Sequence, residues 1–163
     1  MNLNTKILHK KIKLVITDVD GVLTDGGMYY SDEGEIMKKF NTRDGMAVEI
    51  LKNQNIKIIF MTREKSKLVQ KRAEKVKITD LYIGIKDKAS LLPKICKKFS
   101  VTLSEILYIG DDINDIEIME KVGFSACPKN AVSKVKKISN YICKNDGGSG
   151  VLREITDEFF SKK

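Results

Sequence analysis

The sequence has no tryptophan, only three cysteines and no apolar run near the roughly 18 residues that cross a bilayer. The missing run excludes a transmembrane helix. Cys96, Cys127 and Cys143 are odd in number, far apart and without a CxxC pair, which favours reduced structural thiols in a reducing compartment. The basic stretch 1–13 lacks the apolar centre and the small-residue cleavage site of a signal peptide, so we expect a cytoplasmic protein.

Positive charge is in excess, and the formal net charge is +8. This excess makes a nucleic-acid binder one hypothesis, and such a protein would show strongly salt-dependent affinity for DNA or RNA. The lysines, however, are spread along the chain in short clusters, with no aromatic residues interleaved. We therefore expect a solvated basic surface that attracts an anionic substrate, with neither nucleic acid nor a membrane as a partner.

Strand-like and helix-like segments alternate along the 163 residues, a length that suits one domain with its own core. The pattern predicts an α/β fold: a Rossmann-like, mostly parallel open sheet with helices on both faces. A β-hairpin at 28–40, with Gly34 at its turn, is inserted after the first strand and is too small to be a cap domain. We predict strands at 13–18, 56–62, 81–85, 106–111, 123–128 and 141–145, helices at 44–55, 64–76, 88–99, 113–122 and 130–139, and a Gly-rich turn with a terminal helix over 144–163, all in a single domain, 1–163.

Acidic residues crowd the ends of two predicted strands. The first strand runs into Asp18 and Asp20 in "ITDVDGVLTDGG", and the fourth into Asp111, Asp112 and Asp115 in "GDDIND". Parallel strands place both clusters at one edge of the sheet, where open α/β sheets bind ligands. Carboxylates that share a crevice repel one another, so a bound hard cation is expected, and oxygen ligands suit Mg²⁺.

A threonine and a lysine complete a set suited to phosphoryl transfer. Thr62 ends the second strand of the predicted sheet, and Lys88 opens a later helix. Asp18 and Asp20 point to the same side of an extended chain, so one can attack phosphorus while the other moves a proton. The cation and the lysine would neutralise the phosphate. Asp25, by contrast, is as well explained by a turn or a solvated position as by a function.

These motifs carry a family resemblance. "DVDGVLTDG", Met61-Thr62, Lys88 and "GDDIND" resemble the haloacid dehalogenase-like (HAD) phosphatase superfamily. The longer stretch "DVDGVLTDGGMYYSDEGEIMKKFNTRDG" resembles its small capless group that removes phosphate from 3-deoxy-2-ulosonic acids. That group includes phosphatases of 3-deoxy-D-manno-octulosonate (KDO) 8-phosphate and of the 9-phosphates of nine-carbon sialic-type acids. The resemblance covers nearly the whole chain, through "NDGGSGVLREI".

The resemblance implies a role for each motif residue. Asp18 would be the nucleophile and Asp20 the acid/base, with Thr62 and Lys88 binding the phosphoryl group. Magnesium would be held by the Asp18 carboxylate, the Asp20 main-chain carbonyl and Asp111, with support from Asp112 and Asp115. The resemblance also implies a homotetramer in which the hairpins pack together and neighbouring subunits close each active site in place of a cap.

The substrate-binding residues point in two directions. Arg43, in "NTRDG", resembles the octulosonate enzymes, whereas Glu64 and Lys75 resemble the pair with which the nine-carbon acid enzymes meet their longer substrate. The alternative interpretation is that Glu64 is an acid at a helix N-terminus, where the helix dipole favours it, and that Lys75 is a solvated lysine. Arg153, after "GGSG", either binds an anionic group of the substrate or only follows a flexible turn.

The expected function is a Mg²⁺-dependent phosphatase with an aspartyl-phosphate intermediate. Its lead substrate is KDO 8-phosphate, a precursor in lipopolysaccharide synthesis, and the alternative is a sialic-type acid 9-phosphate. A receiver domain, which is phosphorylated once and signals, is the non-enzyme alternative, although its phosphoacceptor would close a middle strand.

Overall fold

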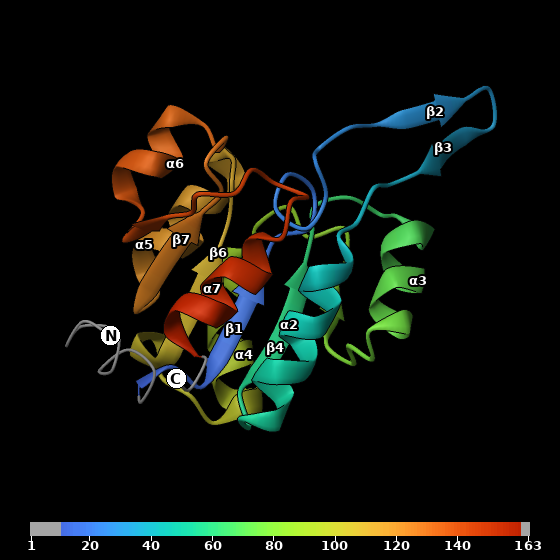
Figure 1. The fold of residues 1–163 in the computed structure, drawn as a ribbon. Helices are drawn as coiled ribbons and strands as arrows, with labels where there is room; N and C mark the ends of the chain where they lie inside the picture. The colour runs from blue at the N-terminus through green and yellow to red at the C-terminus, as the bar shows by residue number, and fades with distance from the viewer. Residues whose placement is uncertain (1–10, 161–163) are drawn as a thin grey trace.

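The computed structural model describes residues 11–160 (Figure 1). Most of the basic stretch 1–13 and the last residues of the predicted terminal segment, 161–163, lie outside the described residues. Six strands form one sheet in the order β5-β4-β1-β6-β7-β8, and every neighbouring pair is parallel. The parallel α/β sheet is thus confirmed. Its strands are β1 (Leu14–Thr17), β4 (Lys57–Met61), β5 (Leu81–Tyr82), β6 (Ile106–Ile109), β7 (Phe124–Cys127) and β8 (Tyr141–Ile142).

The central strands are short, apolar and buried on both faces. All four residues of β1 and all four of β6 are buried, as expected for parallel strands covered by helices. In the register, Thr17 of β1 lies opposite both Phe60 and Ile109. The three central strands therefore end at nearly the same level, and the residues that follow them meet at one edge.

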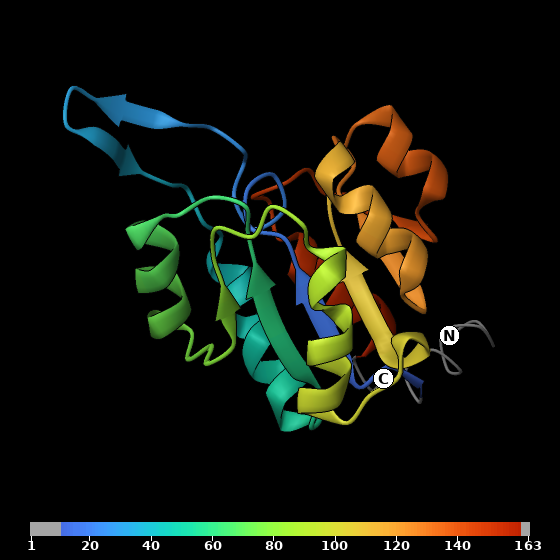
Figure 2. The same cartoon turned by 180° about the vertical axis from the view of Figure 1, so that it is seen from behind.

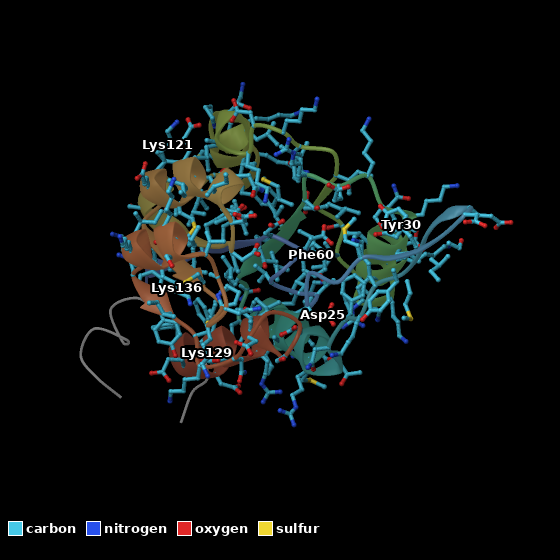
Figure 3. The ribbon with its side chains drawn as sticks, turned by 90° about the horizontal axis from the view of Figure 1, so that it is seen from above. Asp25, Tyr30, Phe60, Lys121, Lys129 and Lys136 are labelled. Atoms are coloured by element: carbon cyan, nitrogen blue, oxygen red, sulfur yellow. The ribbon has the colours of Figure 1, made fainter. Side chains whose placement is uncertain are left out.

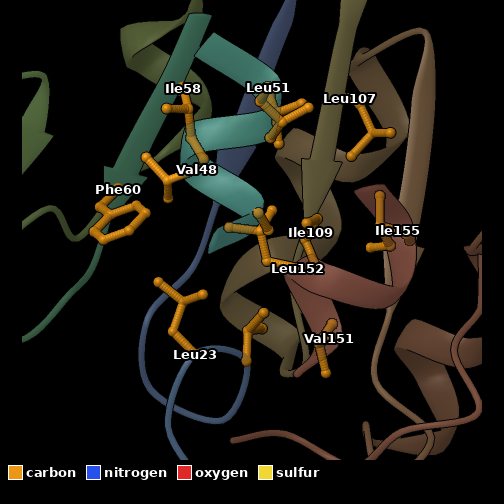
Figure 4. Packing of buried hydrophobic residues seen from close by; sticks show 14 of the residues in the cluster. Leu23, Val48, Leu51, Ile58, Phe60, Leu107, Ile109, Val151, Leu152 and Ile155 are labelled. Carbon is orange, nitrogen blue, oxygen red and sulfur yellow. The ribbon is translucent and has the colours of Figure 1, made fainter. Parts of the chain in front are cut away.

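Helices cover both faces of the sheet (Figures 1 and 2). One apolar cluster packs α2 (Thr42–Asn53), α3 (Lys67–Lys75) and α7 (Val151–Phe159) on one face. Figure 4 shows this cluster, in which side chains of α2 and α7 meet those of β4 and β6. A second cluster packs α4 (Leu92–Phe99), α5 (Ile116–Lys121) and α6 (Ser133–Ile138) on the other face. No helix within 11–160 is long and apolar enough to span a membrane.

The predicted hairpin is present but shorter than expected. β2 (Tyr29–Ser31) pairs with β3 (Gly34–Met37) and projects away from the sheet (Figures 1 and 2). Gly34 has a φ of 111°, which favours glycine at this turn. Apart from an isolated bridge between Thr24 and Phe40, the described chain has no other strand and no helix between β1 and α2. In the described chain, β2 and β3 are therefore the only named elements between β1 and α2.

Several predicted boundaries were wrong for local reasons. The strand expected at 81–85 ends at Tyr82, because Gly84 adopts a φ of 72° that breaks the extended chain. The helix expected at 88–99 opens with a 3-10 turn, Ala89–Leu91, and Pro93 sits in the first turn of α4, where a proline costs no hydrogen bond. The helix expected at 113–122 likewise opens with a 3-10 turn, Ile113–Asp115.

The N-terminus of α7 is capped by a side chain from α2. Gly150, at the cap position, has a φ of 95° and no side chain to offer. Instead, Oδ1 of the buried Asp44 accepts from the Arg153 N–H at 3.0 Å. Burial raises the pKa of Asp44 to about 6, although that hydrogen bond and the charge of Arg72 oppose the shift. Asp44 Oδ2 is buried without a hydrogen-bond partner among the described residues.

We predict that Asp44→Asn folds normally and loses a pH dependence of stability. The amide oxygen still accepts from Arg153, while an uncharged group replaces a buried carboxylate. In the wild type the folded pKa of about 6 exceeds the ordinary 3.8, so wild-type stability falls as the pH rises through this window. The variant's unfolding free energy, relative to wild type, should rise by up to about 3 kcal/mol between about pH 4 and 6. Denaturant titrations at several pH values measure this difference, and a difference that is constant with pH would contradict the assignment.

Candidate active site

A pocket of about 460 Å³ lies at the carboxyl edge of the sheet, where β1, β4 and β6 end. Figure 3 looks down onto this edge of the molecule. Most of the lining side chains are acidic or polar, and they come from all three strand ends. The lining residues are Asp18, Asp20, Gly21, Gly26, Thr62, Arg63, Glu64, Asp111, Asp112 and Asn114.

Asp18 is the first residue after β1 and is only 5% exposed. Its Oδ1 accepts from the Val19 N–H at 2.7 Å and lies 3.0 Å from Lys88 Nζ. Among residues 11–160, no hydrogen bond reaches its Oδ2. One oxygen of the carboxylate is therefore fixed while the other is free, as an attacking oxygen needs to be.

Lys88 is a buried ammonium held between two carboxylates. Its side chain is 1% exposed, and Nζ contacts Asp18 at 3.0 Å and Asp115 at 2.6 Å. Burial lowers the pKa of Lys88, but the two carboxylates outweigh burial and the pKa is raised. Burial, together with the charge of Asp115, raises the pKa of Asp18 well above its ordinary value even though Lys88 opposes this. The single ammonium of Lys88 therefore does not neutralise the neighbouring carboxylates of Asp18, Asp111 and Asp115.

Both carboxylate oxygens of Asp115 accept hydrogen bonds from residues in or next to the acidic cluster. Its Oδ1 accepts from Lys88 and from the Tyr108 hydroxyl, each at 2.6 Å. Its Oδ2 accepts from the main-chain N–H groups of Asp111 at 3.0 Å and Asp112 at 3.4 Å. Although Asp115 lies close enough to Asp18 and Asp111 to share an ion, these four hydrogen bonds make it a support for the cluster.

Asp111 is the carboxylate left without a partner. Its Oδ1 is buried and accepts no hydrogen bond from the described residues. Burial, followed by the charges of Asp115 and Asp112, raises its pKa to about 7. The side chain lies against Gly21, where an added Cβ would come within 2.0 Å of Asp111 Oδ2 and where φ is +87°. Only glycine leaves room for this carboxylate beside Asp18.

These residues fit a magnesium ion. One carboxylate oxygen from each of Asp18, Asp111 and Asp115 lies within 4.8 Å of the others, and a bound cation would give the buried Asp111 Oδ1 the partner that it lacks among the described residues. The donors are hard oxygens, which Mg²⁺ prefers. Since Asp115 is saturated, the fit favours Asp18 and Asp111 as side-chain ligands.

Asp20 and Thr62 both line the pocket and are hydrogen-bonded to each other. Thr62 Oγ1 donates to Asp20 Oδ2 at 2.9 Å and accepts from the Glu64 N–H at 3.0 Å. Asp20 Oδ1 lies 2.6 Å from Lys38 Nζ. The structure therefore brings Asp18, Asp20 and Thr62, from two strand ends, to one pocket.

The other predicted site residues divide into two groups. Glu64 and Asp112 line the pocket, and Asp112 also caps the following turn through the Ile113 N–H. Arg43 and Arg153 instead line a separate hollow of about 500 Å³ beside the start of α7. Lys75 borders a third hollow, near α2 and α3. Within one chain, Arg43, Arg153 and Lys75 are not part of the acidic pocket, and their substrate roles stay predictions.

Sequence reasoning missed several contributors. Lys38 lies within the stretch that resembles the capless group, but nothing in the sequence distinguishes it from its neighbour Lys39, and only the fold reveals its buried contact with Asp20. Asn114 lines the pocket from within "GDDIND", a motif in which only the acids were considered. Asp25 has the turn role that was one of its two interpretations: its Oδ1 accepts from the Gly27 N–H at 3.0 Å.

Comparison with known proteins agrees with this geometry. A family model for haloacid dehalogenase-like hydrolases matches residues 77–155. The 3-deoxy-D-manno-octulosonate 8-phosphate phosphatase KdsC of Escherichia coli (strain K12) is 36% identical over 148 residues, which cover 91% of this chain and 79% of that protein. The chain belongs to the haloacid dehalogenase-like hydrolases.

Solved structures of HAD phosphatases support the same assignment. The 3-deoxy-D-manno-octulosonate 8-phosphate phosphatase from Yersinia pestis superposes with a TM-score of 0.92 at 32% identity, covering 98% of this chain and 86% of that one. The enzyme of the same name from Moraxella catarrhalis, solved with a magnesium ion, a phosphate ion and a KDO molecule, has a TM-score of 0.90 at 34% identity and covers 96% and 90%. This HAD chain is therefore an enzyme of a magnesium-using hydrolase family, which excludes a receiver domain.

We predict that Mg²⁺ stabilises this HAD protein, and more strongly at pH 8 than at pH 6. The pKa of Asp111 is about 7, so the lower pH leaves this ligand largely protonated. At a hundred times the dissociation constant, Mg²⁺ should raise Tm by roughly 5–10 °C. Asp111→Ala should abolish the shift, while the exposed hairpin control Asp32→Ala should keep it. A Tm shift that survives in Asp111→Ala would contradict the metal assignment.

Proposed function

We propose that this protein is a magnesium-dependent phosphatase that hydrolyses KDO 8-phosphate through an aspartyl phosphate on Asp18. The observation that carries the proposal is the Asp18 carboxylate, fixed through Oδ1 by Lys88 and the Val19 N–H, with Oδ2 free. The relatives named as KDO 8-phosphate phosphatases supply the substrate class. The proposed location is the cytoplasm, in keeping with three free thiols.

In the first half of the reaction, Asp18 Oδ2 attacks phosphorus. The P–O bond to the sugar breaks as the Asp18–phosphorus bond forms, and Asp20 gives its proton to the leaving sugar oxygen. The Thr62 hydroxyl and Lys88 orient the phosphoryl group. Magnesium, when held by Asp18, the Asp20 carbonyl and Asp111, supplies positive charge that offsets the charge of the phosphoryl oxygens.

In the second half, Asp20 takes a proton from water. The water oxygen attacks phosphorus, the bond to Asp18 breaks, and inorganic phosphate leaves. Lys88 Nζ lies 3.0 Å from Asp18 Oδ1, where its positive charge would stabilise the carboxylate that forms again.

The proposed assembly is a homotetramer built on the hairpin. Large apolar side chains on it are exposed: Met28, Tyr29, Tyr30, Ile36 and Met37. Such a patch favours contact with another copy. Arg43, Arg153 and Lys75, which lie outside the pocket of their own chain, would meet the sugar acid across subunit boundaries.

A nine-carbon acid 9-phosphate is the second candidate substrate. The observation that favours it is that Glu64 lines the pocket beside Thr62, where a longer sugar acid would reach it. The two candidates are separated by kcat/KM for KDO 8-phosphate and for the 9-phosphates of sialic-type acids. Preference for KDO 8-phosphate is expected, and preference for a 9-phosphate would overturn the lead substrate while leaving the chemistry unchanged.

We predict that Asp18→Asn lowers phosphate release by at least about 10³-fold without unfolding the protein. The amide keeps the shape of the carboxylate but is a poor nucleophile. Asp25→Asn, the matched change at an aspartate that does not line the pocket, should retain wild-type turnover. Near wild-type phosphate release by Asp18→Asn would make the nucleophile assignment wrong. Circular dichroism checks that both variants are folded.

A further inference from the structure

Lys38 is a buried lysine in the hairpin arm, and no motif or relative assigns it a role here. Its side chain is 1% exposed. Nζ lies 2.6 Å from Asp20 Oδ1 and 2.7 Å from Glu35 Oε1. A lysine is rarely so buried unless carboxylates pair with it, and here one partner belongs to the pocket and the other to the hairpin.

The contacts of Lys38 belong to a ring of polar contacts. Glu35, in β3, also accepts a hydrogen bond from the hydroxyl of Ser66, which precedes α3. Thr62, a few residues before Ser66, donates to Asp20 Oδ2. The ring therefore joins three parts of the chain that meet at the pocket: the end of β1, the hairpin, and the loop between β4 and α3.

The two oxygens of Asp20 are held differently. Oδ1 is bound to a cation whose other partner, Glu35, is fixed in the hairpin. Oδ2 is bound to a hydroxyl that has one proton to donate. If Thr62 gave that proton to a phosphoryl oxygen, Asp20 Oδ2 would be free to reach the leaving oxygen, while Oδ1 would keep its contact with Lys38.

We propose that Lys38 is a positioning residue, which anchors the hairpin to Asp20 and aims Asp20 Oδ2 at the leaving oxygen. The proposal rests on the proposed phosphatase function. A proton carrier works only within hydrogen-bond reach of its target, so an unanchored Asp20 protonates the leaving group less often. Asp18, held by Lys88 and not by Lys38, keeps its ability to attack.

The test compares esters that differ in their need for a proton. KDO 8-phosphate and glycerol 3-phosphate release alkoxides, which must be protonated, whereas p-nitrophenyl phosphate releases a weakly basic phenolate. For Lys38→Met, kcat/KM should fall by about 10- to 100-fold on the alkyl esters and stay within about threefold on the aryl ester. A merely structural role would lower both classes equally, and that result would overturn the proposal.

Lys39→Met is the matched control. Lys39 is the next residue, its side chain is 65% exposed, and it lies 3.6 Å from the turn residue Asp25. The kcat/KM of Lys39→Met should match that of the wild type on every ester. An equal alkyl-to-aryl ratio in Lys38→Met and Lys39→Met would overturn the proposal.

Glu35→Gln tests the hairpin half of the ring, and does so even if Lys38→Met fails to fold. The amide oxygen that this change introduces still accepts from Ser66, but the side chain no longer fixes the ammonium by charge. We expect kcat/KM of Glu35→Gln to fall by about 3- to 10-fold on the alkyl esters and not on the aryl ester. If the ratio of alkyl-ester to aryl-ester kcat/KM matched that of the wild type, the hairpin would have no part in positioning Asp20. If the wild type hydrolysed glycerol 3-phosphate but not KDO 8-phosphate, only the proposed substrate would be wrong. The ratio of kcat/KM on glycerol 3-phosphate to kcat/KM on p-nitrophenyl phosphate would still test the role of Lys38.

Discussion

The structure depends on one buried ammonium, that of Lys88, placed among carboxylates at the end of the central strands. Asp18 and Asp115 lie within 3.0 Å of it, and a lysine this deeply buried needs carboxylate partners of this kind. Asp18 follows β1, Lys88 precedes the 3-10 turn after β5, and Asp115 lies in the turn after β6. The alternation of strands and helices brings these three residues together. The acidic edge therefore exists because the parallel sheet aligns its strand ends and because a lysine reaches them.

The single positive charge of Lys88 does not neutralise the carboxylates at this edge of the sheet, and the excess negative charge explains the rest of the site. Asp115 is satisfied by four hydrogen bonds, whereas Asp111 has a buried oxygen without a partner among the described residues. A hard divalent cation supplies the missing charge, and its place beside Asp18 is where a phosphoryl group has to be neutralised. The same positive charge would therefore neutralise the carboxylates and prepare the phosphoryl group for attack by Asp18.

The sequence predicted the features that depend on local pattern or on strand order. The parallel sheet, the hairpin insertion and the gathering of Asp18, Asp20, Thr62 and Asp111 at one edge follow from apolar runs and their order. Element ends such as Tyr82 were missed because they depend on a glycine conformation. The buried contact of Lys38 and the capping of α7 by Asp44 join residues distant in sequence, so only the folded chain shows them.

The central claim is that the Asp18 carboxylate forms a covalent phosphoenzyme. It is tested most directly by quenching the enzyme during turnover with borohydride, which reduces an acyl phosphate to an alcohol, and locating the product by mass spectrometry. Asp18 should be converted to homoserine only when substrate and Mg²⁺ are both present. Reduction at another carboxylate, or none at Asp18 while phosphate is being released, would contradict the account.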